Sequence, residues 1–416
     1  MLPKAAVASL GATLAAVLIV SALLAIGTVG ATPPRPAAPT VVGPRRTTLQ
    51  RPVFHFRAAR AVAFRCAFDS TRLHRCAARF SQRLAPGRHV LRARSVGRSG
   101  VRSRVVTVTV RVVQRLPALA IGTPLVVGPG PGVPAVVDGS VWIPTTEDGG
   151  LIRVAGGASV SRTQVGPRSL GGEGYLDAAA AGRDAIWAAS DIGSTIVRID
   201  PGSGTVTQTL AVAERPGGLT VGAGAIWAFH FLQPAITRID ETHVTARRID
   251  VPDVRAAGLA FGEGSIWLLS VNPNRLVELD LAGAVLRSIP LRPTSSRRAS
   301  LIDAWWLAYG NGAVWATLPN YHAVARIDTA TGAVRYVSLD QGQPFGISVG
   351  GGSAWVATDR AIVRLDGATG TPVAASSLPR AESSAFVSVA YGDGAAWVTN
   401  YDRDTVVRVD DPASPP

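Results

Sequence analysis

The chain has 416 residues, of which 47% are hydrophobic and 17% charged, with 44 glycines, 29 prolines and 2 cysteines. This apolar content excludes a wholly disordered chain, and the length allows two or three domains. Glycine and proline together exceed their usual share of about 12%, which favours many turns and short strands over long helices. The formal net charge of +14 would by itself suggest nucleic-acid binding, so its distribution must be examined first.

The positive charge is concentrated near the N-terminus. Residues 32–116 hold 19 arginines and a single acidic residue, Asp69, which gives this region a local net charge of +18. Residues 117–416 carry a net charge of −5. Such asymmetry indicates a very basic region joined to a mildly acidic one.

The first 31 residues have the pattern of a targeting segment. After Lys4, residues 5–31 carry no charge, and small residues lead to Ala31. This is typical of a secretory signal cleaved after Ala31, but the apolar run is also long enough to span a bilayer as an uncleaved anchor helix. Both readings predict an exported protein, either secreted or membrane-anchored on the extracytoplasmic side. The arginines that follow oppose the positive-inside tendency.

A proline- and threonine-rich linker is expected over residues 32–50, followed by a small basic β domain over residues 51–116. Within that domain, hydrophobic and polar residues alternate over 53–57, 62–68 and 89–96, which predicts half-buried strands with arginines on their outer faces. The only two cysteines, Cys66 and Cys76, lie ten residues apart, and an exported setting would let them form a disulfide.

The order of motifs in this domain resembles a bacterial Ig-like or fibronectin-III-like module. Phe64-Arg-Cys66-Ala-Phe-Asp69, then Cys76, then Gly87-Arg-His89 follow its F-x-C-x-x-D…C…G-x-H pattern. The resemblance covers residues 50–113. It implies a small β-sandwich that serves as a spacer.

The remaining 300 residues are a repeat. Seven tryptophans recur in one sequence context at spacings of 40 to 48 residues: Trp142, Trp187, Trp227, Trp267, Trp315, Trp355 and Trp397. Six of them precede a strand that ends in an aspartate, thirteen residues after the tryptophan in five units and eleven in the sixth, and the aspartate opens a turn. Each unit thus offers four short strands, which is typical of a β-propeller.

This pattern resembles the seven-bladed propellers of the YVTN, NHL and streptogramin-lyase-like group over residues 117–410, with 411–416 as a tail. We therefore expect an all-β protein: a seven-bladed β-propeller preceded by a small Ig-like β-sandwich and a signal or anchor helix. The last unit ends at Asp410 without an outer strand. Residues 117–127 resemble an outer strand, so we predict that they complete the seventh blade and close the ring.

The loops after the tryptophan strands and those after the outer strands are expected on one face of the ring. Polar and aromatic residues on loops over a rigid scaffold make a plausible binding surface, although they could equally be ordinary solvated residues. Trp305 and Trp306 precede an inner strand and could stack on a ligand or plug the channel. The ligand-binding candidates are Asp191, His230, Trp305, Trp306, Tyr321, His322, Asp359, Asn400 and Tyr401.

An enzyme is the alternative. Streptogramin lyases place a metal-supported His/Glu group on one propeller face, and several of their blades carry glutamate three residues after the tryptophan. None of the seven equivalent positions here is glutamate. His230 and His322 are the only histidines on the expected face and lie in non-adjacent blades, so they are weak catalytic candidates and no metal site is predicted. No cofactor is expected, apart from a divalent metal if the lyase alternative holds.

These observations favour an exported, envelope-associated binding or scaffold protein, expected to be a monomer. Its propeller face would recognise a protein, small-molecule or glycan ligand, with a lyase-like C–O lyase of degenerate or altered site as the alternative. Anionic lipid or cell-wall polymer could contact the arginine-rich domain, whereas nucleic acid is not expected. Composition bias is the competing explanation, because 41 of the 42 basic residues are arginine.

Overall fold

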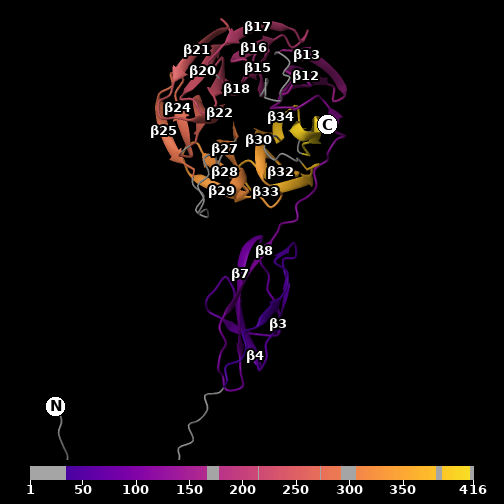
Figure 1. Cartoon of the computed structure of the whole chain (residues 1–416), viewed down its shortest axis with the longest axis vertical. Coiled ribbons are helices and arrows are strands. Elements are labelled where there is room, and N and C mark those ends of the chain that lie inside the picture. Colours follow the sequence, from indigo (N-terminus) through magenta and orange to yellow (C-terminus); the bar gives the residue numbers. More distant parts are fainter. Residues whose placement is uncertain are drawn as a thin grey trace, which may run out of the picture. The chain divides into compact units, whose positions relative to one another are not determined.

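The computed structural model describes residues 34–165, 178–213, 215–271, 273–291, 306–380 and 387–412. The chain divides into two compact units, Met1–Gln114 and Arg115–Pro416, which we call the first and the second unit. The described residues form strands and two short 3₁₀ helices, so the fold is all-β (Figure 1). Within these residues no helix is long and apolar enough to cross a membrane. The expected signal or anchor segment, 1–31, lies outside the described residues.

The first unit consists of two sheets around one apolar core. The core joins Phe54 and Phe56 of one sheet to Phe68, Leu91 and Val110 of the other. The three-stranded sheet has the order β1 (Thr40–Val42), β3 (Val53–Arg57), β6 (Arg79–Ser81). The five-stranded sheet has the order β2 (Arg46–Thr47), β8 (Val106–Val112), β7 (Gly87–Val96), β4 (Ala63–Phe68), β5 (His74–Cys76).

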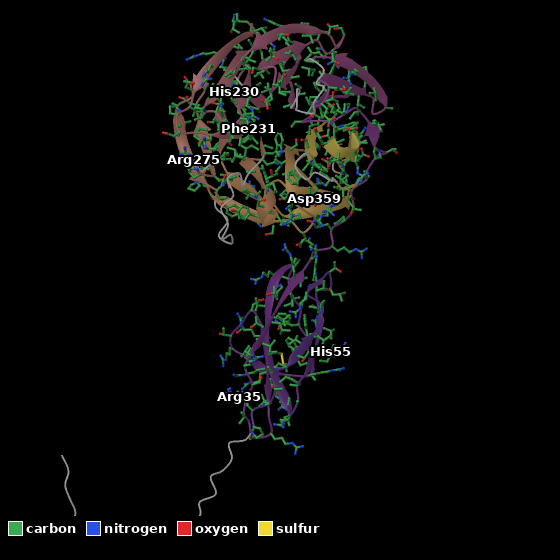
Figure 2. All side chains as sticks on the ribbon, in the orientation of Figure 1. Arg35, His55, His230, Phe231, Arg275 and Asp359 are labelled. Carbon is green, nitrogen blue, oxygen red and sulfur yellow. A yellow bond between two sulfur atoms is a disulfide. The ribbon has the colours of Figure 1, made fainter. Side chains whose placement is uncertain are left out.

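A disulfide joins neighbouring strands of the five-stranded sheet. Cys66 of β4 and Cys76 of β5 are bonded, with their Cα atoms 6.0 Å apart, which confirms the predicted pairing (Figure 2). The alternating pattern of residues 53–57 also gives the expected alternation of buried and exposed side chains. Phe54 and Phe56 are buried, whereas His55 and Arg57 between and beyond them are exposed.

The second unit is a β-propeller whose sheets follow one another around a ring (Figure 1). Its described residues form seven four-stranded antiparallel sheets, which we number as blades in chain order. Blade 1 comprises β10 (Ala135–Val137), β11 (Ser140–Thr145), β12 (Gly150–Ala155) and β13 (Ser159–Gln164); blade 2 comprises β14 (Ala178–Ala181), β15 (Ile186–Ser190), β16 (Thr195–Ile199) and β17 (Val206–Ala211); blade 3 comprises β18 (Pro216–Gly222), β19 (Ala225–His230), β20 (Ala235–Asp240) and β21 (Thr245–Asp250).

The later blades repeat this order. Blade 4 comprises β22 (Ala256–Gly262), β23 (Ser265–Ser270), β24 (Arg275–Leu279) and β25 (Val285–Pro290); blade 5 comprises β26 (Leu307–Gly310), β27 (Ala313–Leu318), β28 (Ala323–Asp328) and β29 (Val334–Ser338). Blade 6 comprises β30 (Pro344–Gly350), β31 (Ser353–Thr358), β32 (Ala361–Asp366) and β33 (Pro372–Ser377); blade 7 comprises β34 (Val387–Gly392), β35 (Ala395–Asn400), β36 (Thr405–Asp410) and β9 (Leu125–Val126). The inner strand β34 also contacts β10 of blade 1, so the ring closes.

The ring is closed by a strand from the start of the second unit. β9 pairs with β36, with Leu125 opposite Val406, and Ile121 bridges to Val409. This confirms the predicted outer strand from residues 117–127. Leu119 is buried in the core between blades 6 and 7, and Val127 in the core between blades 7 and 1, so the latch adds apolar contact as well as strand pairing.

The second strand of every blade is buried along its whole length, apart from the last residue of β35. A sheet packed on both faces needs such a continuous apolar run. The repeated tryptophan of this strand fills the space between adjacent blades. Six of the seven are at most 1% exposed, and Trp397 is 6% exposed.

Candidate functional site

Two sets of loops share one end of the propeller, because antiparallel strands within a blade alternate in direction. One set joins the second strand of a blade to its third, and the other set joins the fourth strand to the next blade. We call this end the loop face. Most of the ligand-binding candidates lie in the first set, where they contact the second set directly.

An exposed arginine on the loop face is held between an acid and a phenyl ring. Arg215, which leads into blade 3, forms a two-pronged ion pair with Asp191 of the β15–β16 loop at 3.2 and 3.3 Å. Its guanidinium carbon lies 5.1 Å from the centre of the Phe231 ring, which follows β19. The side chain is 51% exposed. A planar cation fixed over a ring presents both charge and apolar surface to solvent.

Two further candidates meet at one loop segment between blades 5 and 6. His322 ends the 3₁₀ helix η1 (Pro319–Tyr321), is exposed, and bonds through Nδ1 to the Gly342 carbonyl at 3.3 Å. Asp359 is buried and accepts the Gln343 N–H at 2.8 Å. Gly342 has φ +134°, and a Cβ there would overlap the Asp359 carboxylate, so both candidates hold the same tight backbone.

His230 is not a surface residue, contrary to the expectation that it lies on the exposed loop face. It is fully buried at the end of β19, and its Nε2 lies 2.8 Å from the Thr237 hydroxyl on β20 (Figure 2). The strand continues one residue further than a loop assignment assumes, so this ring points into the blade. The residue that reaches the surface region is its neighbour Phe231, which is partly buried.

Trp306 packs into the core between blades 5 and 6. Its ring contacts the cluster that contains Trp315 and Ile347, and its backbone exchanges bonds with Thr317 of β27. Its indole Nε1 is buried without a hydrogen-bond partner among the described residues. These contacts hold the ring as part of the wall between blades. Trp305 lies outside the described residues.

Blades 7 and 1 meet at Tyr401, in the 3₁₀ helix η2 (Tyr401–Arg403). Its hydroxyl bonds to the side chains of Thr146 and Glu147 of the β11–β12 loop. Burial, and then the hydrogen bond to the Glu147 carboxylate and its charge, raise the pKa of Tyr401 despite the opposing effect of Thr146. Tyr321 of η1 is also partly buried, and it packs against the core of blades 4 and 5.

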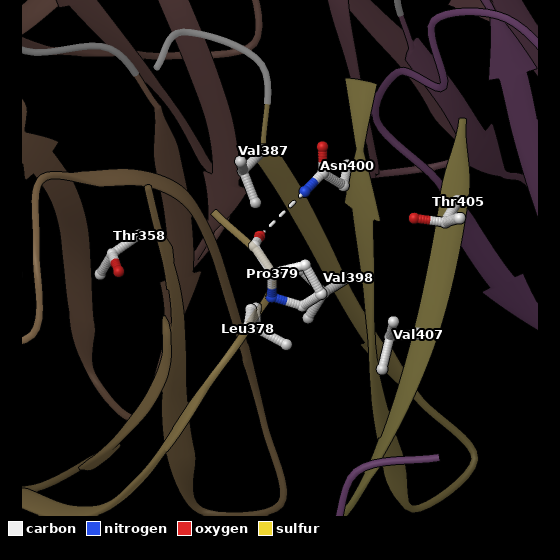
Figure 3. Close-up of a pocket in the computed structure, with 8 residues that line it drawn as sticks. All are labelled: Thr358, Leu378, Pro379, Val387, Val398, Asn400, Thr405 and Val407. Carbon is white, nitrogen blue, oxygen red and sulfur yellow. Dashed lines mark hydrogen bonds between the residues drawn. The ribbon is translucent and has the colours of Figure 1, made fainter. Parts of the chain in front are cut away.

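A narrow apolar cavity lies beside Asn400, between blades 6 and 7 (Figure 3). Val387, Val398 and Val407 line it, and the Asn400 amide donates to the Pro379 carbonyl at 3.2 Å. The volume of the cavity in which the centre of a water molecule can lie is about 10 Å³. This is close to the smallest volume that holds one water molecule. The Asn400 Oδ1 is buried without a partner among the described residues. This cavity fits a water rather than a ligand.

The loop face therefore uses many of its polar groups to tie loops together. The described residues contain no group of three or more His, Cys, Asp and Glu side chains that could hold a metal ion. The two histidines bond to different groups in blades 3 and 5, so they do not form one site. What the face presents to solvent is a rigid surface on which Arg215 is prominent.

Arg215 and Phe231 were not among the sequence-based candidates. Both loop sets were expected on one face, but the candidates came almost entirely from the loops after the tryptophan strands. The contact joins residues 16 positions apart in different loop sets, and no spacing rule predicts a stack of this kind. The signal available in the sequence was that both loop sets were expected on one face of the propeller.

No protein-family model matches the chain, and no curated protein matches it. Among solved structures, the chain is similar to hydrazine synthase from Kuenenia stuttgartiensis, with a TM-score of 0.57 and 14% identity over 69% of this chain and 97% of that one. It is also similar to the Pan2 WD40 domain from Neurospora crassa, with a TM-score of 0.54 and 11% identity over 68% of this chain and 90% of that one. Identities this low show a shared β-propeller fold and nothing about activity.

Proposed function

We propose that this chain is an exported, envelope-associated binding or scaffold protein whose loop face recognises a ligand. The exposed stack of Arg215 on Phe231, fixed by Asp191, carries this proposal. Arginine and aromatic residues dominate the energetics of recognition surfaces, and a pre-ordered side chain loses little entropy on binding. The ligand class is a protein, a small molecule or a glycan.

We favour binding over a lyase-like activity on the geometry of the histidines. His230 is enclosed within blade 3, where it contacts Thr237. His322 is exposed on blade 5 and contacts a backbone carbonyl. Catalysis by an acid–base pair requires both groups within reach of one substrate, and these two side chains face different surroundings.

The finer family assignments belong to the same proposal. The second unit is proposed to be a relative of the YVTN, NHL and streptogramin-lyase-like propellers, on the strength of its tryptophan and aspartate spacing. The first unit is proposed to be an Ig-like spacer, on the strength of its cysteine, aspartate and histidine motif and its two sheets. The disulfide is compatible with export.

Site-specific photocrosslinking in cells tests recognition by the loop face. A photoreactive phenylalanine is placed at Phe231 or, as a control, at Val285 on the outer strand of blade 4, which is 53% exposed. We expect a discrete crosslinked adduct from position 231 only. Adding Arg215→Ala should reduce its yield at least about tenfold, as for a residue central to an interface. Equal adducts from both positions, or none from 231, would contradict the proposal.

Fractionation tests export and anchorage together. A tagged full chain is followed in cytoplasmic, membrane and medium fractions, with and without detergent, and by protease added to intact cells. We expect protease-accessible protein outside the cytoplasm. Release without detergent indicates cleavage after Ala31, and release only with detergent indicates a retained anchor. Protein found only in the cytoplasm would overturn export.

A further inference from the structure

The outer face of the five-stranded sheet in the first unit carries an ordered array of arginines. On β7, Leu91, Ala93 and Ser95 point inward and are fully buried. Because side chains alternate along a strand, Arg88, Arg92 and Arg94 project from the opposite face. Neighbouring strands add to this face, which we call the arginine face: Arg46, Arg65, Arg75, Arg88, Arg92, Arg94 and Arg111.

The register places these arginines directly opposite one another. Arg65 of β4 has Arg75 of β5 on one side and Arg94 of β7 on the other. Arg88 of β7 likewise lies opposite Arg111 of β8, which lies opposite Arg46 of β2. Like charges in directly opposed positions destabilise a sheet.

Acidic side chains do not balance this charge within the unit. Asp69 is the only acidic residue between residues 34 and 114, and it is engaged by His89 at 2.6 Å and by the Val90 N–H at 2.7 Å. The Nε groups of Arg65 and Arg94 are buried without a hydrogen-bond partner among the described residues. Partial burial, and then the charges of Arg102 and Arg65, lower the pKa of Arg94.

Arginines also stand directly opposite one another in the second unit, where Arg238 lies opposite Arg247 and Arg326 lies opposite Arg335. There, one arginine of each opposed pair has a carboxylate and an indole beside it: Arg238 pairs with Asp240 at 3.3 Å and lies over Trp227, and Arg326 lies 4.0 Å from Asp328 and over Trp315. The opposed arginines of the second unit thus have counter-charges within the fold, whereas the row of Arg65, Arg75 and Arg94 forms no ion pair among the described residues of the first unit. An external anion would supply the counter-charge for this row.

We propose that the arginine face binds an extended phosphodiester polymer that carries no bases. Guanidinium groups match phosphate oxygens with two parallel hydrogen bonds, and adjacent strands place successive arginines about 4.8 Å apart. A chain of phosphates can run across β5, β4 and β7 at the first row, follow β7 past Arg92 for about 20 Å, and continue over β8 and β2 at the second row. This inference concerns the first unit and stands independently of ligand recognition by the propeller.

The twist of the sheet and the character of its exposed side chains favour this polymer over other polyanions. Five strands twisted by about 20–25° per step turn through roughly 80–100°, so a flat membrane cannot contact both rows at once, whereas a flexible chain can follow the twist. Single-stranded nucleic acid is held by exposed aromatic rings. The phenylalanines of this unit instead form its core or, as the partly buried Phe64 and Phe80 do, pack against it.

The test uses the full chain and fluorescent poly(glycerol phosphate) as the probe, measured by anisotropy at several NaCl concentrations. If about six phosphates are neutralised, the affinity should fall roughly 300-fold between about 50 and 200 mM NaCl. A triple variant, Arg65→Gln, Arg75→Gln and Arg94→Gln, should leave a fall of roughly 20-fold and bind at least about tenfold more weakly at the lower salt. A charge-matched control changes Arg51, Arg57 and Arg79, which lie outside this sheet, to glutamine and should bind as the unchanged chain does.

Each result decides between the alternatives. Equal weakening by both triple variants would mean that only net charge matters, and would overturn the assignment to this face. Tighter binding of an oligonucleotide of equal phosphate number, or of vesicles containing anionic lipid, would overturn the choice of polymer. Absence of binding by a chain whose thermal unfolding is intact would overturn the proposal entirely. The face variant should fold, because its substitutions remove like-charge contacts.

Discussion

At the residue scale, arginines of the propeller stack on the blade tryptophans. In six blades an arginine of the third strand lies directly opposite the tryptophan of the second, as Arg326 lies opposite Trp315. In five of these pairs the guanidinium carbon lies 5.2–5.9 Å from the centre of the indole ring. The cation covers an aromatic face that would otherwise meet water, so these charges belong to the fold rather than to a binding surface.

In blade 4 the arginine that stacks on the tryptophan comes from the fourth strand instead of the third. Glu278 stands opposite Trp267, where other blades have arginine. Arg287 of the next strand pairs with Glu278 at 2.8 Å and places its guanidinium carbon 5.3 Å from the Trp267 ring. The glutamate thus turns a neighbouring arginine toward the indole, and the contact is retained.

Removing one such cation should destabilise the second unit. Arg326 is 14% exposed, stacks on Trp315 and donates to the carbonyls of Gly367 and Asn311. Arg326→Met keeps the aliphatic stem but loses the cation and leaves both carbonyls without this donor. We expect a loss of about 2 kcal/mol in the free energy of unfolding, measured by urea titration with tryptophan fluorescence.

The matched control is Arg248→Met on the outer strand of blade 3. Arg248 is 50% exposed, and its Nε donates to the exposed carboxylate of Asp250 at 2.8 Å. A surface pair of this kind contributes less than about 1 kcal/mol, so the control should lose less than Arg326→Met does. Equal losses would show that the stack on the indole contributes nothing.

At the scale of single elements, the aspartate that ends the third strand organises the turn to the fourth. Asp240 accepts the N–H groups of Thr242 and His243, and these bonds lower its pKa to about 2. Asp200, Asp328 and Asp366 accept equivalent bonds in their blades. The turns therefore prefer the ionised carboxylate.

Acid should weaken these turns. The pKa of Asp240 in the folded chain, about 2, lies below the ordinary value of 3.8, so its contribution is present above about pH 4 and is lost as the pH falls toward 2. Asp240→Asn keeps an acceptor oxygen and removes the titration, so its urea midpoint should fall less between about pH 5 and pH 2.5 than that of the unchanged chain. Asp250→Asn is the control, and an identical decline in both variants would refute the assignment.

The first unit should respond to pH in the opposite direction. Burial opposes the charge on His89, but its bonds to Asp69 and to the Ala85 carbonyl, and the charge of Asp69, raise its pKa. Its contribution is therefore present below about pH 6.5 and is lost as the pH rises through the folded pKa. Pulse proteolysis of the full chain, with cleavage between residues 34 and 114 followed by mass spectrometry, should show lower stability at pH 8 than at pH 6. Asp69→Asn should remove most of that difference.

The sequence predicts those elements in which a local pattern and the tertiary contacts agree. The buried tryptophan strands, the aspartate turns and the latch from residues 117–127 all follow from the repeat and its incomplete last unit. The 3₁₀ helices η1 and η2 were not predicted, because one-turn helices lack a periodic signal. The burial of His230 was missed for a related reason: one residue at a strand end decides whether a side chain enters the blade or the loop face.

At the scale of the whole molecule, the unequal charge of the two regions corresponds to two ways of using arginine. Where propeller arginines oppose one another, as Arg326 and Arg335 do, an indole and a carboxylate lie beside one of them, whereas Arg65, Arg75 and Arg94 of the arginine face oppose one another in a unit with a single acidic residue. Composition and strand alternation predict where the charge lies. They do not predict which arginines oppose each other, because that depends on the register between strands far apart in the sequence.

Ring closure predicts how the chain tolerates truncation. Removal of residues up to Gln114 takes away one compact unit and leaves all seven four-stranded sheets of the described second unit. We expect this variant to keep a cooperative unfolding transition, followed by tryptophan fluorescence. Removal through Val127 also takes away β9 and the buried side chains of Leu119 and Val127, and exposes the edge of β36.

The longer truncation should lose on the order of 4 kcal/mol or more and should aggregate, because an open strand edge pairs with other chains. A circular permutant controls for the loss of sequence alone. In it, residues 115–127 follow Asp411 through a short glycine-rich linker, and the chain begins at Gly128. This permutant should recover most of the lost stability, since β9 can again pair with β36. If it unfolds as readily as the longer truncation, closure by this strand is not what stabilises the ring.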